Sequence, residues 1–250
     1  VVGSGVVRCF MGMQSDRRGA MPVREHIDET VRVLGEVAPR AEELGIRIGL
    51  ENHGGGDLLV RELRQLIDDV GSPAVGACID SGNAIYAGED PLLAAEILAP
   101  VTITCQLRDA RVWRTRAGAA VQWTPLGQGD LDLIAFLRVL GSAQPDLGIH
   151  AEVITSRAPI TIDFLDPGTT YWECYPELGA ADFSRFLRYL QDDRPRPLDQ
   201  LELHPSLMAP TEDNLPELRR QQIAHVAASL DWLVAQSAAL EGSGETTHEK

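Results

Sequence analysis

Apolar residues follow two alternating spacings along the first 155 residues of the chain. Continuous apolar runs, long enough for strands that are buried on both faces, occupy residues 6–11, 46–50, 75–79, 101–107 and 147–154. Between these runs, apolar residues recur at every third or fourth position, as they do on the buried side of a helix. Strands that alternate with helices in this way predict βαβ units and a parallel sheet.

The predicted helices have recognisable ends. One helix begins at Pro22, and its apolar stripe ends just before a glycine. The apolar stripe over residues 59–70 also ends just before a glycine. A third helix begins with Asp90 as its N-cap and Pro91 in its first turn. A fourth is predicted to begin at Asp130 and to run through residue 140. These lengths suit helices that cross over between parallel strands.

The pattern is weaker after residue 155. The predicted elements there are a helix at 180–191, a turn at 193–197, a short strand at 201–204 and a last helix at 215–240. The apolar side of the first of these helices predicts a core or subunit contact; it consists of Phe183, Phe186, Leu187 and Leu190. We expect residues 1–240 to form a single domain. Residues 241–250 are polar and rich in Gly, Ser and Thr, which predicts a disordered tail.

The composition is that of a globular protein, with 44% hydrophobic and 24% charged residues and a formal net charge of −15. An acidic field repels a phosphate backbone, so nucleic-acid binding is disfavoured. No apolar run is long enough to cross a bilayer, which predicts a soluble protein with no membrane partner. The first residues lack an initiator Met and a signal-like stretch, as the interior of a longer protein would. The four cysteines form no Cys-x-x-Cys pair, which favours reduced thiols and a cytoplasmic location.

Four polar residues stand at or near the carboxyl ends of successive predicted strands: Glu51, Asp80, Gln106 and Glu152. The carboxyl ends of parallel strands meet at one edge of a barrel, where active sites lie. Three acids that converge there would repel one another, and each would be costly to keep ionised in a semi-enclosed site. A divalent cation between them would relieve both problems.

Five segments around these positions resemble the xylose isomerase-like TIM barrel superfamily, which includes sugar phosphate isomerases and epimerases and the AP endonuclease family 2 type. The segments are Gly49-Leu50-Glu51-Asn52-His53, Cys78-Ile79-Asp80-Ser81-Gly82-Asn83, Gln106-Leu107-Arg108-Asp109, Pro125-Leu126-Gly127-Gln128-Gly129-Asp130 and Glu152-Val153. The resemblance implies a (β/α)8 TIM barrel in the α/β class, with its first one or two βα units upstream of Val1. It also implies one divalent ion, Mn, Mg, Co or Zn, held by the four polar residues at the strand ends.

Gln106 departs from the family pattern, because most relatives have His at this position. With Gln, all four predicted ligands are oxygen atoms, and oxygen-only sites favour hard cations. We therefore expect Mn or Mg rather than Zn or Co. Some related dehydratases that act on dehydroshikimate-like substrates also have Gln there, so the substitution is compatible with an active site.

His53, Asn83 and Arg108 are the predicted substrate-binding residues. His53 lies just past Glu51, the resemblance places Asn83 where relatives often have a substrate-contacting His or Asn, and Arg108 is two residues from Gln106, so strand alternation directs it to the same side. Arg108 could bind a carboxylate, a phosphate or an enediolate oxygen. The alternatives are a structural ion pair for Arg108 and ordinary loop polarity for the other two. Asp109 and Arg111 are weaker candidates for the site. His150 is expected to be a core histidine, and Trp172 and Tyr175 are expected to be either pocket walls or packing residues.

The resemblance implies an isomerase or epimerase that acts on a sugar or sugar-like ketose through a metal-stabilised enediolate. Glu51 and Glu152 would be its catalytic acid and base on opposite faces of the substrate. A metal-dependent dehydratase of the inosose or 3-dehydroshikimate type and a non-catalytic binding protein stay open as alternatives. An endonuclease is disfavoured, because the six histidines lack the spacing for a three-metal site. A homo-oligomer is expected by analogy with relatives.

Overall fold

The structure is a computed structural model that describes residues 3–53, 56–154, 158–191 and 210–242, with side chains described as far as residue 237. Five parallel strands form its main sheet in the order β1 (Val6–Phe10), β2 (Arg47–Glu51), β3 (Val75–Asp80), β4 (Thr102–Leu107) and β7 (Ile149–Ala151). The predicted parallel sheet is confirmed. All five strands run in one direction, so their carboxyl ends share one edge of a half-barrel.

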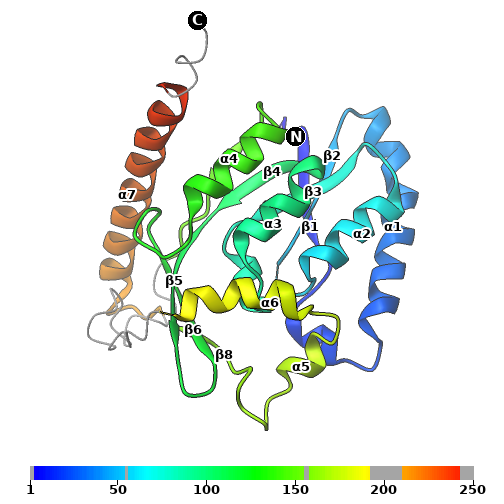
Figure 1. The fold of residues 1–250 in the computed structure, drawn as a ribbon. Helices are drawn as coiled ribbons and strands as arrows, with labels where there is room; N and C mark the ends of the chain where they lie inside the picture. The colour runs from blue at the N-terminus through cyan, green and yellow to red at the C-terminus, as the bar shows by residue number, and fades with distance from the viewer. Residues whose placement is uncertain (1–2, 54–55, 155–157, 192–209, 243–250) are drawn as a thin grey trace, which may run out of the picture.

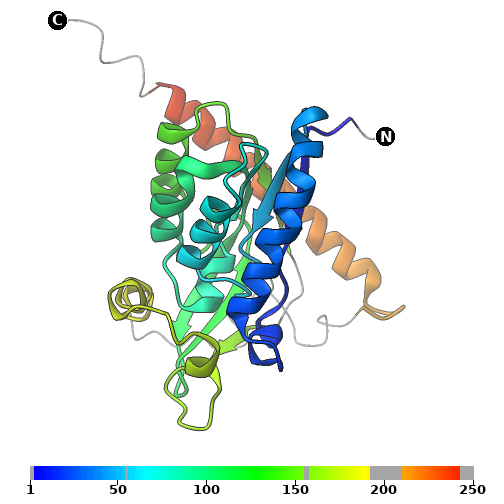
Figure 2. The same ribbon diagram turned by 90° about the vertical axis from the view of Figure 1, so that its right-hand side faces the viewer.

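Four helices lie side by side along one face of this sheet; they are α1 (Val23–Glu43), α2 (Val60–Val70), α3 (Pro91–Leu98) and α4 (Leu133–Ala143) (Figures 1 and 2). Short 3-10 helices η1 (Gln14–Arg18), η2 (Asn83–Ala87) and η3 (Ala99–Val101) join the elements. The predicted start of α4 at Asp130 is wrong, because the Asp132 side chain caps this helix by accepting a hydrogen bond from the Ala135 N–H. The Asp130 carboxylate instead accepts a hydrogen bond from the N–H of Val112 at 2.7 Å.

A second sheet, which the sequence did not predict, extends from the carboxyl edge of the first. Its antiparallel order is β5 (Asp109–Arg114), β6 (Ala119–Thr124) and β8 (Ile160–Ile162). Every residue of β6 is buried. The chain turns into β5 directly after β4, which places this sheet over the mouth of the half-barrel.

The strand predicted at residues 147–154 is shorter in the structure, since β7 ends at Ala151. Glu152 therefore follows the strand by one residue. Its backbone N–H still donates to the Leu107 carbonyl at 2.9 Å, which holds it in line with the sheet.

The remaining helices are α5 (Tyr171–Cys174), α6 (Ala180–Phe186), η4 (Leu187–Leu190) and α7 (Leu215–Gly242). The turn predicted at 193–197 and the strand predicted at 201–204 lie outside the described residues. So do residues 243–250 of the predicted tail, whereas 241–242 belong to α7 and are not disordered. Within the described part of the chain, no helix is both long and apolar enough to cross a membrane.

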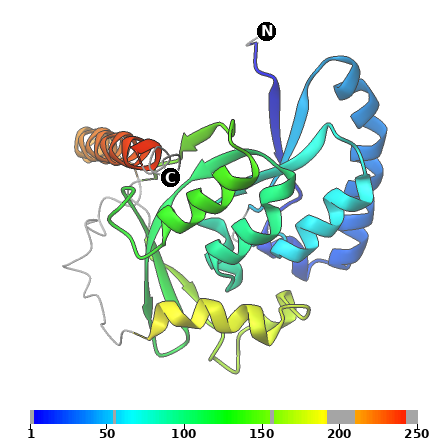
Figure 3. The ribbon, with the colours of Figure 1, turned by 45° about the horizontal axis from the view of Figure 1, so that its top comes forward.

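Helix α7 stands away from the layer of α1 to α4, on the side of β5 and β7 (Figure 3). Three contacts tie it to loops on that side. The Gln222 side-chain N–H donates to the Val153 carbonyl at 2.8 Å, and the Ser229 hydroxyl accepts from the Leu126 N–H at 3.1 Å. Trp232 packs directly on Gly127, where an added Cβ would lie 2.2 Å from the indole.

The core lies between the main sheet and its helices. Strand β3 is buried throughout, with Ala77 and Ile79 fully inaccessible to solvent. Burial of a Leu or Ile side chain contributes about 1.5–3 kcal/mol, so the helices' apolar sides hold the layers together. Strand β1 forms an exposed edge instead, since Val7 and Phe10 are 51% and 43% exposed. The half-barrel is therefore open beside β1.

Candidate metal centre

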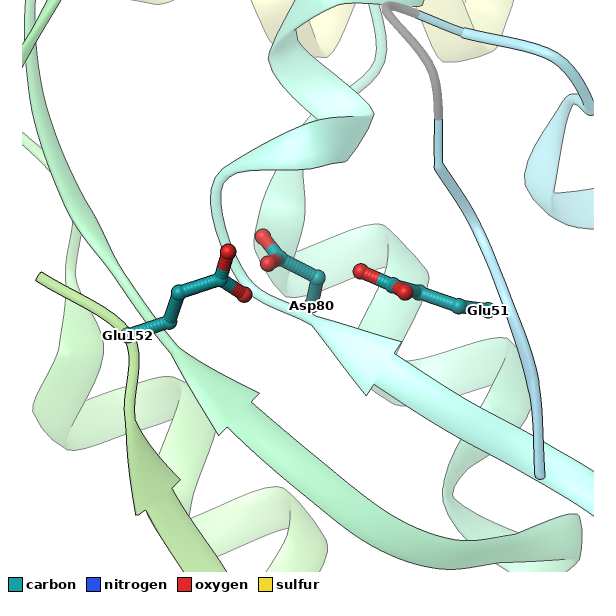
Figure 4. Close-up of side chains that lie close together, drawn as sticks. All are labelled: Glu51, Asp80 and Glu152. Carbon is teal, nitrogen blue, oxygen red and sulfur yellow. The ribbon is translucent and has the colours of Figure 1, made fainter. Parts of the chain in front are cut away.

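Three carboxylates converge at the carboxyl edge of the main sheet. Glu51 ends β2, Asp80 ends β3 and Glu152 follows β7, and Figure 4 shows their side chains pointing toward one another with Asp80 in the middle. One oxygen from each lies within 4.8 Å of the others. Ligand oxygens on opposite sides of one divalent ion are about 4–5 Å apart, so a single ion fits this spacing.

Each of the three carboxylates also has a buried oxygen without a donor. Glu51 Oε2, Asp80 Oδ2 and Glu152 Oε2 accept no hydrogen bond from any residue that the structure describes. A buried acceptor that is left unsatisfied costs about 1–3 kcal/mol, and more when it is charged. A cation bound by all three would remove that cost, so these residues fit a divalent metal ion.

The other carboxylate oxygens are held in place by neighbouring groups. Asp80 Oδ1 accepts hydrogen bonds from the N–H groups of Gly82 at 2.7 Å and Asn83 at 2.9 Å, and Glu51 Oε1 accepts from the Asn83 side chain at 3.2 Å. The Asn52 side chain bonds both backbone groups of Asp80. One oxygen of Glu51 and one of Asp80 are thus anchored by hydrogen bonds.

Two arginines partly balance the acids. Arg8 Nη1 lies 2.8 Å from Glu51 Oε2, with angles unlike those of a hydrogen bond, and donates to the Gln106 side-chain oxygen at 3.0 Å. Arg108 Nη2 lies 3.1 Å from Asp80 Oδ2 and also pairs with Glu152 Oε1. Arg8 thereby brings Gln106 beside Glu51, and the role of Gln106 as a fourth ligand stays a prediction.

The electrostatics of this cluster favour a bound cation. Burial raises the pKa of Glu51 to about 8, the charge of Asp80 adds to this effect, and Arg8 opposes it. Burial also raises the pKa of Asp80, against the effect of Arg108. Without an added positive charge, it is costly to keep Glu51 and Asp80 ionised together. A divalent ion reverses this balance.

The predicted substrate-binding residues all border the carboxylates. His53 stacks on Phe10 with ring centroids 4.0 Å apart, and burial lowers the pKa of its imidazole. Asn83 is bonded to two of the carboxylates, as described above, and so positions them. Arg108 is 5% exposed and its guanidinium lies over the Trp123 ring at 4.4 Å.

The less supported candidates have structural roles. Asp109 accepts hydrogen bonds from the N–H groups of Ala110, Gly127 and Gly129, so it anchors the loop at 125–130. Arg111 donates to a carbonyl in the same loop. His150 is exposed, so its prediction as a core histidine is wrong. That prediction assumed a closed barrel around β7.

The predicted aromatic walls are packing residues. Trp172 is 46% exposed and donates its indole N–H to the Phe164 carbonyl. Tyr175 is 1% exposed, and its hydroxyl donates to the Gly56 carbonyl at 2.9 Å. The Arg17 guanidinium lies over its ring at 4.9 Å. Neither aromatic ring contacts the three carboxylates in the described structure.

Sequence reasoning missed Arg8, Asn52 and Trp123. Asn52 directly follows Glu51, and its position after a buried strand was an available signal. Arg8 interrupts an apolar strand, which also marks it as unusual. Nothing in the sequence predicted Trp123, because its strand pairing was not predicted.

A polar cavity of about 250 Å³ opens on the same edge of the sheet. Gln14 and Arg18, which follow β1, and Tyr86, which follows β3, are among its lining residues. The Tyr86 ring meets the Trp123 ring edge-on at 5.0 Å, and Trp123 supports Arg108. None of the three carboxylates lines this cavity, so it is separated from the carboxylate site by Tyr86 and Trp123.

Known proteins resemble this chain over part of their length, as three of them illustrate. The chain is 30% identical over 107 residues to the 3-oxo-isoapionate decarboxylase of Pectobacterium atrosepticum. The matched segment covers 42% of this chain and 38% of that protein. A xylose isomerase-like TIM barrel protein from Mycobacterium smegmatis, solved with magnesium, is 16% identical to this chain, with a TM-score of 0.51. The match covers 83% of this chain and 63% of that protein's chain. The IOLI protein, solved with a zinc atom, is 18% identical with a TM-score of 0.49 over 75% and 62%.

The chain spans less than two thirds of the length of each of these relatives. The model of one family, the xylose isomerase-like TIM barrel, matches residues 1–188, well over half of the chain. That segment contains the whole parallel half-barrel and all four predicted metal ligands. The chain therefore belongs to the xylose isomerase-like TIM barrel family.

Proposed function

We propose that this chain is a divalent-metal-dependent enzyme that moves a proton next to the carbonyl group of a sugar or sugar-like ketose, as an isomerase or epimerase. The observation that carries the proposal is the set of three buried carboxylate oxygens that converge without hydrogen-bond donors from the described residues. Membership in a family with sugar-modifying relatives supports it.

Glu51, Asp80 and Glu152 would hold the ion, with Gln106 as a fourth ligand. Because all these donors are oxygen atoms, Mn or Mg suits the site better than Zn or Co. When bound, the ion would polarise the substrate's carbonyl and stabilise the negative charge that develops on its oxygens.

Glu51 and Glu152 approach the centre from opposite sides of Asp80 (Figure 4). One carboxylate would remove the proton from the carbon beside the carbonyl, and the other would return a proton to the opposite face or to the neighbouring carbon. Glu51 is fully buried, so water is kept from its carboxylate. Arg108 and Asn83 would orient the substrate's oxygens.

Solvent exchange tests this proposal. The manganese-loaded chain is incubated in D₂O with a panel of ketoses and inososes, and deuterium incorporation beside the carbonyl is followed by NMR. We expect Glu51→Gln and Glu152→Gln each to lower the exchange rate by about 10²–10⁴-fold. Glu89→Gln is the matched control, because Glu89 is a buried glutamate that caps α2 and lies outside the site. Unchanged exchange in both site variants would exclude these roles.

A second candidate is a lyase. The 30% identity to a protein named as a decarboxylase and the Gln at position 106 both favour it. If a hydroxyl group lies β to the carbonyl, loss of the neighbouring proton forms a C=C bond while the hydroxyl leaves, takes up a proton and becomes water. Mass spectrometry of the product separates the candidates, because isomers keep the substrate's mass whereas dehydration and decarboxylation lower it.

A further inference from the structure

Arg8 reaches from the open edge of the half-barrel to two candidate metal ligands. It lies on β1 opposite Gly49 of β2, whereas Gln106 lies on β4, the third strand from β1 in the sheet. Because Gly49 has no side chain, none on β2 stands between Arg8 and the interior at this level. Arg8 Nη1 donates to Gln106 Oε1 at 3.0 Å and lies 2.8 Å from Glu51 Oε2. One nitrogen therefore contacts an oxygen of both residues.

This contact determines which way the Gln106 amide points. A glutamine amide can present either its oxygen or its NH₂ group to a neighbour, whereas a guanidinium has only donors and pairs with the oxygen alone. The amide oxygen has two lone pairs, so it can accept from Arg8 and still bind a cation. An NH₂ group in the same place could not bind a cation. Arg8 thus selects the orientation in which Gln106 can be a ligand.

The other candidate ligands do not need such a partner. Glu51, Asp80 and Glu152 are carboxylates, whose two oxygens are both acceptors when the group is ionised. Half a turn of a carboxylate leaves an acceptor in place, whereas half a turn of the Gln106 amide replaces an acceptor by a donor. Arg108 pairs with two of these carboxylates, so Arg8 is the arginine that contacts the amide.

Arg8 also has an effect of the opposite sign. Its positive charge repels a cation at the site, although its side chain is 38% exposed and water screens part of this repulsion. The repulsion does not depend on what residue stands at position 106. The orienting effect requires an amide there, so the two effects can be measured separately.

We propose that Arg8 is a positioning residue of the metal centre, which holds the Gln106 oxygen toward the ion and so makes Gln106 a ligand. The inference rests on the proposed function, because it concerns the ion of that site. It goes further in making the ligand at position 106 depend on the residue at position 8. A cation centre on three acids alone needs neither residue.

A double-mutant cycle on manganese affinity tests this inference. The dissociation constant of Mn²⁺ is measured by electron paramagnetic resonance for the full chain, Arg8→Met, Gln106→Ala and the double variant. Repulsion by Arg8 is present in both backgrounds and cancels in the cycle. We expect loss of Arg8 to weaken binding at least about 10-fold more when Gln106 is present than when it is Ala, as for other partners that orient metal ligands.

Two further arginine variants complete the test. Arg8→Lys keeps the charge but lacks the planar set of donors, so its cycle with Gln106→Ala should show a smaller coupling of about 3-fold or more. This second cycle decides the question if Arg8→Met does not fold. Arg47→Met is the matched control, because Arg47 is an exposed arginine at the opposite end of β2 from Glu51. It should leave the dissociation constant within about 2-fold of the wild type.

The possible results separate this inference from the proposed function. Equal effects of the Arg8 variants in both backgrounds, whether they weaken or tighten binding, overturn the inference, because Arg8 would then act through its charge alone. Wild-type affinity in Gln106→Ala also overturns it and leaves a centre of three carboxylates. A wild-type chain that takes up no manganese overturns both.

Discussion

Replacing Glu51 by Gln should stabilise the metal-free protein at alkaline pH and abolish metal binding. Glu51 is fully buried, and its pKa is raised from 4.5 to about 8. Gln has the same shape without the charge, and its amide oxygen can still accept the hydrogen bond from Asn83. The variant therefore removes one titrating proton, together with the ion-pair partner of Arg8.

The sign of the effect follows from which state holds the proton. Below pH 4.5, Glu51 is protonated in both the folded and the unfolded chain, and it has no effect on the pH dependence of stability. Between pH 4.5 and about 8, the unfolded chain releases this proton while the folded chain keeps it, so the free energy of unfolding falls as the pH rises. Above pH 8 the loss is complete.

The size of the loss comes from the pKa difference. At about 1.4 kcal/mol for each pKa unit, the rise from 4.5 to about 8 corresponds to at most about 5 kcal/mol. Relaxation around a buried charge reduces such values, so we expect about 2–5 kcal/mol. Glu51→Gln should thus match the wild type near pH 5 and exceed it by this amount at pH 8.5.

Urea unfolding in the presence of EDTA, at several pH values from 5 to 8.5, measures the difference. Glu89→Gln is the control, because burial also raises the pKa of Glu89 to about 8. It should show a similar pH trend. Added manganese should stabilise the wild type and Glu89→Gln but not Glu51→Gln. A stability difference between Glu51→Gln and the wild type that does not change with pH would refute the reasoning.

Three other variants test the scaffold. Arg17→Met breaks the buried pair with Glu62 at 2.7 Å, and should lower the free energy of unfolding by about 3–5 kcal/mol; a change below about 1 kcal/mol contradicts this. Gly127→Ala places a Cβ 2.2 Å from Trp232 at a φ of +79°, and should lower the free energy of unfolding by about 1–3 kcal/mol. A double-mutant cycle should show a smaller loss of unfolding free energy in a Trp232→Ala background. Asp109→Ala removes the acceptor of two loop N–H groups, those of Gly127 and Gly129, and should accelerate hydrogen exchange at Gly127 about 10-fold or more; unchanged exchange would show that the loop does not need this anchor.

The parallel sheet and the acids at its edge were predictable because both signals are local. Strands β2 to β4 are continuous apolar runs, and Glu51 and Asp80 end two of them directly. The position of Glu152 could be predicted only to within a residue of the end of its strand. Side-chain direction follows from position in a strand, so residues at successive strand ends of a parallel sheet must meet.

The second sheet could not be predicted in the same way. Strand β6 pairs with β5 across the short connection 115–118, but with β8 across α4 and β7, so only the second pairing depends on distant residues. The β5–β6 hairpin places Trp123 under Arg108, and strand periodicity alone does not show how such a hairpin lies against the main sheet. The prediction for His150 was wrong for a related reason, since the burial of this side chain depends on what lies beside β7.

Helix α7 gives the candidate metal centre a dependence on residues outside the family match. The family match ends at residue 188, yet Gln222 of α7 holds the carbonyl of Val153, the residue after Glu152. A chain shortened at residue 188 would keep every candidate ligand but lose Gln222, which holds the backbone carbonyl next to Glu152. Transplanting this centre onto another scaffold would likewise require an equivalent brace behind Glu152.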